Sequence, residues 1–593
     1  MITILFYDFE VFKEDWLVVI LDVTNQKEHI IINDADKLEK FYKANKRDVW
    51  VGYNSRGYDQ YILRAILCGF NPKEVNDFII VQGKKGWQFS SLFRKFPLNN
   101  YDVFLTNDGG LKSLEGFMGN NIKETSVPFD IDRKLTEEEL QETVKYCRYD
   151  VEQTIEVFIQ RKEEFESHLS LIKAFNLPLS YISKTKAQLS AIILGAVKQR
   201  HNDEFEISFP DTLKVEKYKQ IVNWYKNPLN RDYDKVLNVD VAGVPHVFAW
   251  GGLHGAIDKY SGSGYFINVD VASYYPALMI EYDWLSRNIA DPSKFKEIRD
   301  KRLVMKAEKN PMQQPYKIVL NSTYGAMKDM NNTMYDPRQA NNVCVGGQLL
   351  LLDLIEKLEG FCEIIQSNTD GVLIKMPIGQ SEESWFNKVD DICYEWETRT
   401  RMQLEFEEFR KIFQKDVNNY MIVSADGRYK TKGGYIKQLT NLDYDLPIVN
   451  RAVKNYFLTG TRPEETVNSC DLLKDFQKIV KVSGKYLHAL YNPTVTTEKF
   501  RDENGRLKTG KRFIGGEVQN ENCFRVFASK RSSDGGIFKV KNETKNPEKF
   551  ANTPERCFIV NESVNGMEVP SYLDRGWYID FAKKRLKDFG VIL

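Results

Sequence analysis

Short apolar segments of β-strand character that carry carboxylates constrain the fold of this chain most. Residues 1–22 read as two apolar strands around a short polar turn, which predicts a β-hairpin. Asp8 and Glu10 lie two apart on the first strand, so both side chains leave the same face. A carboxylate in such a setting is costly unless it is paired or binds a metal ion. An Asp-x-Glu pair alone, however, is seldom catalytic.

Two further segments of the N-terminal third carry groups of the same kind. Residues 47–70 read as a strand, a glycine-bearing turn with Asn54, and a helix that begins near Asp59. Thr136 precedes three glutamates, a helix-start pattern that predicts one long helix over residues 136–165.

Tyr146 and Asp150 lie four apart on that predicted helix and therefore share a face. Four carboxylates and one tyrosine from three elements suit a two-metal phosphodiesterase, in which the tyrosine orients the attacking water. Each residue also has a plainer interpretation. Asn54 suits a turn, Tyr146 suits a core, and Asp150 suits a solvated helix face.

The middle of the chain repeats the combination of strand and carboxylate. Residues 264–276 read as a buried strand that carries Asp270 and is stopped by Pro276. Residues 363–375 read as two short apolar strands around Asn-Thr-Asp-Gly, which predicts a hairpin with Asp370 in its turn. An acid at the end of a buried strand is expected to be paired or metal-bound. Asp370 alone has the simpler interpretation of a common turn residue.

Two predicted helices between these segments could surround an anion. They span residues 293–309 and 316–328, and each carries one polar stripe. The stripes consist of Arg299, Arg302, Lys306 and Lys309 on the first helix and Lys317, Asn321, Tyr324 and Gly325 on the second. A solvated basic face is the alternative. The chain has no GxxxxGK[ST] motif, which disfavours a Walker-type NTPase.

Charge is distributed unevenly along the chain. Its 593 residues contain 83 basic and 83 acidic side chains. Residues 1–410 hold 51 basic and 61 acidic side chains, a balance of −10, and residues 411–593 hold 32 and 22, a balance of +10. A basic C-terminal part beside an acidic body suits a nucleic-acid enzyme, because basic groups release counterions from phosphates. Ordinary surface drift explains the split equally well.

The remaining composition excludes several classes of protein. The length predicts about three to five structural units. Hydrophobic residues at 42% and charged residues at 28% exclude a disordered or collagenous chain. We find no internal repeat, no apolar run near the ~20 residues of a membrane span and no signal peptide. The eight cysteines form no CxxC pair, which predicts a reducing, cytoplasmic environment.

Taken in chain order, six motifs resemble those of the family B DNA polymerases of the small phage and plasmid type, which carry a 3′–5′ proofreading exonuclease. The similarity covers about residues 1–440. Three exonuclease motifs are matched by Asp8-Phe9-Glu10, by Asn54 through Tyr58-Asp59 and by Tyr146 through Asp150. Polymerase motifs A, B and C are matched by residues 270–276 (DVASYYP), 317–325 (KIVLNSTYG) and 368–370 (NTD).

The resemblance implies a multidomain fold of the α/β and α+β classes. An RNase H-like exonuclease domain would precede a right-hand polymerase with palm, fingers and thumb. The implied boundaries are 1–190 for the exonuclease, 191–262 for a connecting region, 263–290 and 331–440 for the palm, 291–330 for the fingers and 441–593 for a DNA-binding thumb.

The resemblance also implies a role for each matched residue. Two Mg²⁺ ions per site, replaceable by Mn²⁺, would be held for nucleotidyl transfer by Asp270, Val271 and Asp370. The exonuclease ions would be held by Asp8, Glu10, Asp59 and Asp150, with Tyr146 positioning the water. The incoming dNTP would meet Ser273, Tyr274, Tyr275, Arg302 (or Arg299 in its place), Lys306, Lys317, Asn321 and Tyr324, with Tyr275 excluding a 2′-hydroxyl. DNA would meet Asn54, Tyr58, Lys123, Gly251, Gly252, Tyr429, Lys430 and Lys432.

The chain departs from the family motifs at three positions. Asn368 stands where motif C begins with Asp, Gly371 stands where Ser follows, and Tyr274 replaces the usual Leu of motif A. The second Asp of motif C is the indispensable metal ligand in the family, and here it is Asp370. We therefore expect activity, with altered metal affinity or fidelity.

The spacing of the motifs bears on the primer. Only 46 residues lie between Asp270 and Lys317, and 42 between Gly325 and Asn368. Neither gap can hold the large insertions of the terminal-protein-primed polymerases. We expect extension of an ordinary RNA or DNA primer on a template with dNTPs. The setting would be viral DNA replication in a host bacterial cytoplasm. A helicase, primase or single-strand binding protein is a candidate partner, and no membrane is expected.

Three rival hypotheses remain from the sequence. A terminal-protein-primed replicase is opposed by the short gaps. A DNA-binding exonuclease with an inactive polymerase site is supported only by Asn368. A stand-alone nuclease leaves motifs A and B unexplained.

Overall fold

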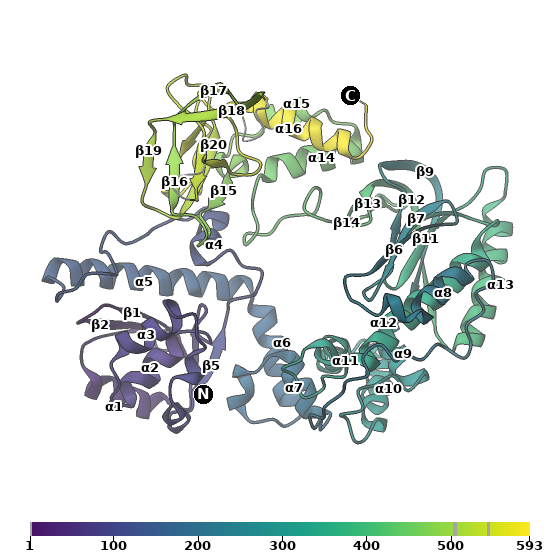
Figure 1. Cartoon of the computed structure of the whole chain (residues 1–593), viewed down its shortest axis with the longest axis horizontal. Coiled ribbons are helices and arrows are strands. Elements are labelled where there is room, and N and C mark those ends of the chain that lie inside the picture. The colour runs from purple at the N-terminus through teal and green to yellow at the C-terminus, as the bar shows by residue number, and fades with distance from the viewer. Residues whose placement is uncertain (1–2, 502–506, 542–545, 593) are drawn as a thin grey trace. The chain divides into compact units, whose positions relative to one another are not determined.

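A computed structural model describes residues 3–501, 507–541 and 546–592. The chain forms two compact units, each assembled from separate segments (Figure 1). Unit 1 comprises residues 1–165, 178–183 and 438–583, and unit 2 comprises residues 166–177, 184–437 and 584–593. Among the described residues, no helix combines the length and the apolar character needed to cross a membrane.

The N-terminal part of unit 1 is built on a five-stranded sheet in the order β3-β2-β1-β4-β5. The first three strands pair antiparallel, and β4 and β5 continue the sheet in parallel. The strands are β1 (Ile4–Val11), β2 (Trp16–Asp22), β3 (Lys27–Ile32), β4 (Val49–Gly52) and β5 (Asn99–Asp102). The helices are α1 (Ala35–Asn45), α2 (Asp59–Leu67), α3 (Pro72–Ile80), α4 (Leu111–Met118) and α5 (Glu137–Gln160), with short 3₁₀ turns η1 (Gly86–Gln88), η2 (Ser91–Lys95) and η3 (Leu179–Ser183).

Alternation along β1 separates an apolar face from a polar one. Tyr7 and Phe9 join Leu5 in a buried core with residues of α1, α2 and α3. Phe6 points the other way and meets Phe158 of α5, with ring centroids 5.1 Å apart. Asp8 and Glu10 have the same parity as Phe6, so the strand period of two places them on the α5 side. The predicted common face of the two acids is confirmed.

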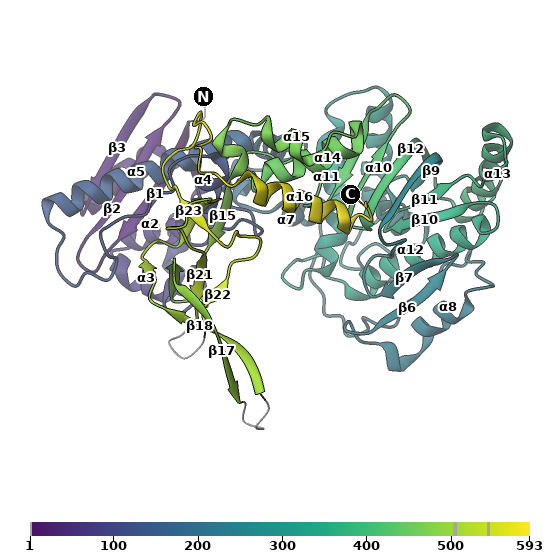
Figure 2. The same ribbon diagram turned by 90° about the horizontal axis from the view of Figure 1, so that it is seen from above.

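The C-terminal part of unit 1 consists of small sheets and helices. Its sheets have the orders β15-β20-β23, β19-β16-β21-β22 and β17-β18. The strands are β15 (Lys478–Lys481), β16 (His488–Tyr491), β17 (Thr494–Arg501), β18 (Leu507–Ile514), β19 (Glu517–Gln519), β20 (Cys523–Ala528), β21 (Ile537–Val540), β22 (Glu548–Lys549) and β23 (Cys557–Ile559). The helices are α14 (Pro447–Thr459), α15 (Pro463–Asn468), the 3₁₀ turn η5 (Leu473–Phe476) and α16 (Arg575–Asp588), which runs on into unit 2. Figure 2 shows the β17–β18 hairpin beside β21 and β22.

Arg525 of β20 joins the two parts of unit 1. Its side chain is fully buried, and burial lowers its pKa to about 10. The guanidinium donates to the Gln477 side chain and to four carbonyl oxygens, at 2.6–3.2 Å. Those carbonyls belong to Gly116 and Asn120 around the end of α4, and to Val560 and Glu562. Since buried polar groups must be hydrogen-bonded, this residue fixes α4 to the C-terminal part.

Unit 2 is built on a nine-stranded sheet in the order β14-β13-β12-β9-β11-β10-β8-β7-β6, with every pair antiparallel. The strands are β6 (Val236–Val241), β7 (Val244–Ala249), β8 (His254–Ala256), β9 (Tyr260–Val271), β10 (Glu363–Asn368), β11 (Gly371–Lys375), β12 (Leu404–Asp416), β13 (Asn419–Val423) and β14 (Tyr429–Lys432). Residues 191–262, which we expected to form a connecting region, thus supply three strands of this sheet.

Unit 2 also contains helices, most of which connect the strands of the sheet. They are α7 (Lys186–Ile193), α8 (Lys219–Lys226), α9 (Tyr274–Glu281), α10 (Ser293–Ala307), α11 (Gln313–Lys328), α12 (Pro337–Leu358) and α13 (Glu382–Thr400), with the 3₁₀ turn η4 (Pro228–Asn230) and α6 (Lys162–Ala174), which begins in unit 1. The two helices predicted on either side of residue 310 are confirmed as α10 and α11, which pack together.

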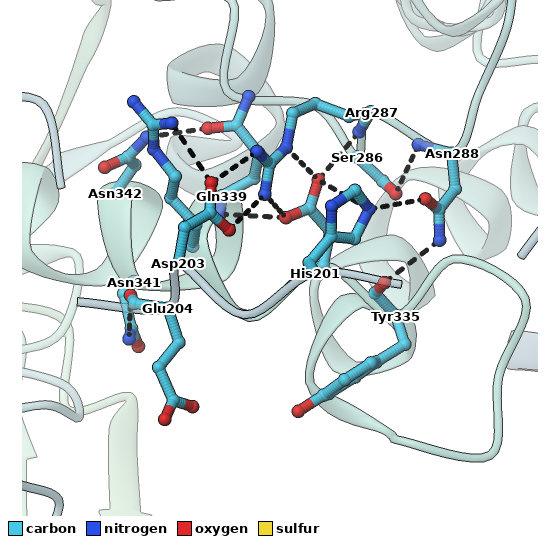
Figure 3. A network of polar contacts seen from close by, with 12 residues as sticks. His201, Asp203, Glu204, Ser286, Arg287, Asn288, Tyr335, Gln339, Asn341 and Asn342 are labelled. Atoms are coloured by element: carbon cyan, nitrogen blue, oxygen red, sulfur yellow. Dashed lines mark hydrogen bonds and ion pairs between the residues drawn. The ribbon is translucent and has the colours of Figure 1, made fainter. Parts of the chain in front are cut away.

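A polar network fixes the start of α12 (Figure 3). Arg287 donates to both oxygens of Asp203 and to both oxygens of Asp336, the residue that caps α12. Asn288 donates to the carbonyls of Thr333 and Tyr335. Because α12 packs against α9, the network also supports the helix that carries the motif A tyrosines.

Two local predictions were wrong. The helix predicted over residues 136–165 begins as expected, with Thr136 and Glu139 in a reciprocal cap, but it ends at Gln160. There Arg161 turns its guanidinium to Asp108, at 2.7 and 2.8 Å, and the backbone leaves the helical region.

The second wrong prediction concerns Pro276, which does not stop the strand. The strand ends at Val271, where Ser273 adopts a left-handed φ of 50°, and Pro276 lies in the first turn of α9.

Candidate active sites

The first site is a cluster of carboxylates in unit 1, gathered from β1, α2 and α5. Glu10, Asp59 and Asp150 are buried, and the backbone N–H of Phe9 donates to Asp59 at 3.1 Å, which ties α2 to β1. Asp8 and Glu10 each approach Cys147 of α5, with candidate ligand atoms of the three residues all within 4.8 Å. The structure therefore brings together the four acids that the sequence placed on three elements.

Burial and mutual repulsion raise the pKa values of these carboxyls. Burial, then the charges of Asp59 and Glu10, raises the pKa of Asp8 well above its usual range. Burial, then Asp150, does the same for Glu10, and burial raises the pKa of Asp59 to about 7. Like charges held together in a buried place favour either protons or a bound cation. Carboxylate oxygens are the ligands that Mg²⁺ prefers, so the donor set fits a divalent metal ion.

One lysine lies inside this cluster, and it is not the one that the sequence suggested. Lys112, on α4, donates to Asp150 at 2.5 Å and to Glu115 at 3.1 Å, and its ammonium lies 4.7 Å from the ring centroid of Tyr146. Burial lowers the pKa of Lys112, but the carboxylates of Asp150 and Glu115 outweigh it, and the net pKa is raised. Lys123 lies farther out, 5.8 Å from the ring centroid of Tyr149.

The other predicted exonuclease residues lie around the carboxylates. Burial and then Asp150 raise the pKa of Tyr146, which hydrogen-bonds that acid. Burial, followed by the charges of Asp59, Glu10 and Asp8, raises the pKa of Tyr58. Its hydroxyl donates to Asn76 of α3 at 2.8 Å. Asn54 has a left-handed φ of 58° at the turn before α2, where its carbonyl accepts from the N–H groups of residues 57 and 58.

The second site lies in unit 2, at one end of three neighbouring strands. Asp270 on β9 is paired across the sheet with Gly371 of β11 and Glu405 of β12, and Asp370 precedes β11. The N–H of Val271 donates to the carbonyl of Asp370 at 2.8 Å, so both aspartates lie at the same end of the sheet.

The neighbouring strand explains the glycine at position 371. A Cβ atom at this position would lie 1.9 Å from a carboxylate oxygen of Asp270 and 3.1 Å from the carbonyl oxygen of Val269. The serine that follows motif C in the family would therefore displace the Asp270 carboxylate. Asn368 lies beside His254 of β8 and hydrogen-bonds its ring.

Burial, followed by the charge of Asp370, raises the pKa of Asp270 to about 6. Burial likewise raises the pKa of Asp370. Asn268 donates to Asp270 at 2.6 Å and leaves the other carboxylate oxygen available. Two hard oxygen donors side by side, with raised pKa values, again fit a divalent cation.

A cavity of about 520 Å³ opens beside Asp370 and is lined from both sides by polar groups. Arg302 donates to the Ser273 hydroxyl at 3.0 Å, and Lys306 pairs with Glu405 at 3.3 Å. The lining residues include Ser273, Tyr274, Tyr275, Arg302, Lys306, Lys317, Asn321, Asp370 and Glu405. Tyr324 packs on Tyr275 with ring centroids 4.4 Å apart. Arg299 does not line this cavity, because it pairs with Glu281 at 3.1 Å.

A second cavity, of about 330 Å³, is lined by Asp270 and shares Asp370 with the first. Lys430 and Lys432 of β14 line it, and Lys430 pairs with Glu407. Tyr429 begins the same strand. Gly252 lies beside the turn at residues 368–370, since a Cβ there would be 3.0 Å from the Thr369 hydroxyl, whereas a Cβ at Gly251 would meet none of the described atoms within 4 Å.

Sequence reasoning missed four residues of these sites. Lys112 and Glu115 belong to the first, and Glu405 and Glu407 to the second. The acids on β12 have a usable pattern, because Glu405 and Glu407 lie two apart on a strand. Lys112 has none, since only the fold brings α4 to Asp150.

No protein-family model matches the chain, and no curated protein matches it. Among solved structures, the family B DNA polymerase from the hyperthermophilic archaeon Pyrobaculum calidifontis is similar at 14% sequence identity and a TM-score of 0.41. The similarity covers 100% of this chain and 78% of that one. A likeness this weak carries no argument about function.

Proposed function

We propose that the protein is a DNA-directed DNA polymerase of family B type with a 3′–5′ exonuclease. One observation carries the proposal. Asp370, cations of two helices and the tyrosines Tyr274 and Tyr275 line one cavity in unit 2, and Asp270 and Asp370 line the cavity beside it. The order of the five-stranded sheet, two antiparallel pairs followed by two parallel strands, is that expected of an RNase H-like exonuclease domain and supports the second activity.

In polymerisation, this chain would position a triphosphate between the palm and fingers. Arg302 and Lys306, now held by Ser273 and Glu405, would turn to the phosphates together with Lys317. Tyr275, packed against Tyr324, would form the floor under the sugar and leave no room for a 2′-hydroxyl. Asp270, Val271 and Asp370 would hold Mg²⁺, which supplies charge stabilisation to the attacking and leaving oxygens. The primer end would enter from the side of Lys430 and Lys432.

In exonuclease action, Asp8, Glu10, Asp59 and Asp150 would hold the metal ions. Tyr146 would orient the attacking water, and Lys112 would keep Asp150 ionised beside it. Asn54 and Tyr58 would hold the frayed primer end. The proposed setting, viral DNA replication in a bacterial cytoplasm with helicase, primase or single-strand binding partners, rests on the sequence resemblance alone.

A labelled-primer assay tests the proposal. Purified protein is given Mg²⁺ and a 5′-labelled primer annealed to a longer template, with and without dNTPs. We expect the primer to lengthen with dNTPs and to shorten without them. Shortening under both conditions, even with Mn²⁺, would contradict polymerase activity and favour an exonuclease with an inactive polymerase site, the alternative that Asn368 supports.

A further inference from the structure

Residues 78–98 of unit 1 form a basic aromatic segment that neither active site uses. The segment contains four cations, Lys84, Lys85, Arg94 and Lys95, and no acidic residue. Within the described part of the chain, none of the four forms an ion pair, and Lys84 instead lies 4.9 Å from the ring centroid of Phe78. The nearest preceding acid, Asp77, is already paired with Lys73. The segment therefore carries four uncompensated positive charges.

The same segment exposes apolar side chains that a solvated loop does not need. Trp87 is 64% exposed, and Ile80 and Val81 are 63% and 75% exposed. Leu92 is also exposed. Tryptophan is usually mostly buried. Surfaces that bind single-stranded nucleic acid combine exposed aromatic rings, on which bases stack, with cations that contact the phosphates. An exposed indole among lysines is such a combination.

Internal packing holds the segment in place. Phe89 and Phe93 stack with centroids 6.0 Å apart, and both meet Phe70 edge-on. Gly86 lies so close to Tyr61 that an added Cβ would be 2.3 Å from its ring. The exposed residues are thus presented by an anchored surface, which lowers the entropy cost of binding.

The anchor also ties the segment to the exonuclease site. Tyr61 belongs to α2, which begins at Asp59, and it contacts Phe93 with centroids 5.9 Å apart. Tyr58 is bonded to Asn76 of α3, the helix that leads into the segment. A strand bound here would lie on a segment that packs against α2, the helix that begins at Asp59.

We propose that residues 78–98 bind single-stranded DNA, with a base stacked on Trp87 and phosphates on Lys84, Lys85, Arg94 and Lys95. Single-stranded DNA fits better than a duplex, because bases within a duplex are already stacked and offer no free face to an indole. This binding stands apart from the proposed catalysis and can be measured without metal ions.

Fluorescence anisotropy of a labelled oligo(dT) with the full chain in EDTA tests the proposal. We expect Trp87→Ala to weaken binding by about 5- to 100-fold, the equivalent of one lost base stack, and Trp87→Phe to retain most of it. The paired variant Lys84→Gln/Lys85→Gln should reduce the slope of log affinity against log salt by about 1.4, the value for two single-strand phosphate contacts. The matched control Lys40→Gln/Lys46→Gln removes two exposed lysines of the same unit and should leave the affinity unchanged.

Two further measurements distinguish base stacking on Trp87 from general electrostatic attraction to DNA. Oligo(dT) should quench indole emission more in the wild type than in Trp87→Phe, and Trp87→Ala should leave duplex affinity unchanged. Circular dichroism confirms that each variant is folded. Equal oligo(dT) affinity in the wild type, Trp87→Ala and the Lys84/Lys85 variant would overturn the proposal and assign the exposed apolar residues to another partner. Equal weakening for single strand and duplex would overturn it too, because it would remove the role of the base.

Discussion

The two carboxylate sites of this chain differ in how closely positively charged side chains are held to the acids. In unit 1 the acids are buried and enclose their own ammonium, with Lys112 bonded to Asp150. In unit 2 the two aspartates border neighbouring cavities. The α10 cations Arg302 and Lys306 contact the Ser273 hydroxyl, the Gln313 side chain and the exposed Glu405. This difference agrees with the proposed functions, because a site that binds a free triphosphate must keep its cations available for the incoming anion.

The sites also differ in what supports them. Lys112 and Glu115 lie on α4, and Arg525 of the C-terminal part fixes the end of that helix. Asp270 and Asp370, in contrast, depend on strands of one sheet. The comparison predicts that the first site is sensitive to distant changes, and the second to changes within its own strands.

The largest expected effect comes from Arg525→Met. The substitution removes five hydrogen bonds, two of them buried, so we expect a loss of about 3 kcal/mol or more in the stability of unit 1. Hydrogen exchange should show loosened protection in β20 and α4, with the nine-stranded sheet of unit 2 unchanged. Arg512→Met is the control, because that arginine is exposed and pairs with the exposed Glu498, so its loss should cost less than about 0.5 kcal/mol. Equal effects of the two changes would refute the supporting role of Arg525.

Lys112→Ala should lower exonuclease activity by about 10²- to 10³-fold while leaving polymerisation intact. Without the ammonium, Asp150 keeps its proton to a higher pH, so the acidic limb of the pH–rate profile should move upward. Steady-state rates measured across pH give both readings. Lys123→Ala is the matched control, with a smaller effect expected. A larger loss from Lys123→Ala would restore the assignment made from the sequence.

Gly371→Ser tests the site in unit 2 in the same way. The added Cβ would meet the Asp270 carboxylate, so polymerisation should fall by up to about 10²-fold, while primer degradation continues. Rates of single-nucleotide addition measure this effect. Gly325→Ala serves as the control for an added methyl group, because among the described residues nothing beyond the local backbone of α11 lies within 4 Å of the position that its Cβ would take. Unchanged addition by Gly371→Ser would show that Asp270 has room to move.

The smallest effect concerns pH and metal ions. Folding raises the pKa of Asp59 to about 7 and that of Asp270 to about 6, so each folded carboxyl binds its proton more tightly than the unfolded one. Their contribution to stability is complete below about pH 4 and is lost as the pH rises through these values. The metal-free protein should therefore melt at a lower temperature at about pH 7.5 than at about pH 5. Mg²⁺ should raise the melting temperature more at the higher pH. Asp59→Asn should make the melting temperature depend less on pH. A metal effect independent of pH would count against both sites.

The sequence could predict those features that depend on local periodicity. The common face of Asp8 and Glu10 follows from the strand period, and the start of α5 follows from the cap at Thr136. It could not predict what long-range contacts decide. Arg161 pairs with Asp108 where α5 ends, Arg525 of β20 holds the end of α4, and α4 brings Lys112 to Asp150. No local pattern carries that information.

The most direct test of two independent sites uses one labelled primer–template and two variants, Asp8→Ala and Asp270→Ala. Asp8→Ala should stop primer shortening without dNTPs and leave extension at the wild-type rate. Asp270→Ala should lower the rate of primer extension by about 10³-fold or more and leave primer shortening intact. Loss of both activities in either variant, with the protein folded, would contradict the separation of the two sites.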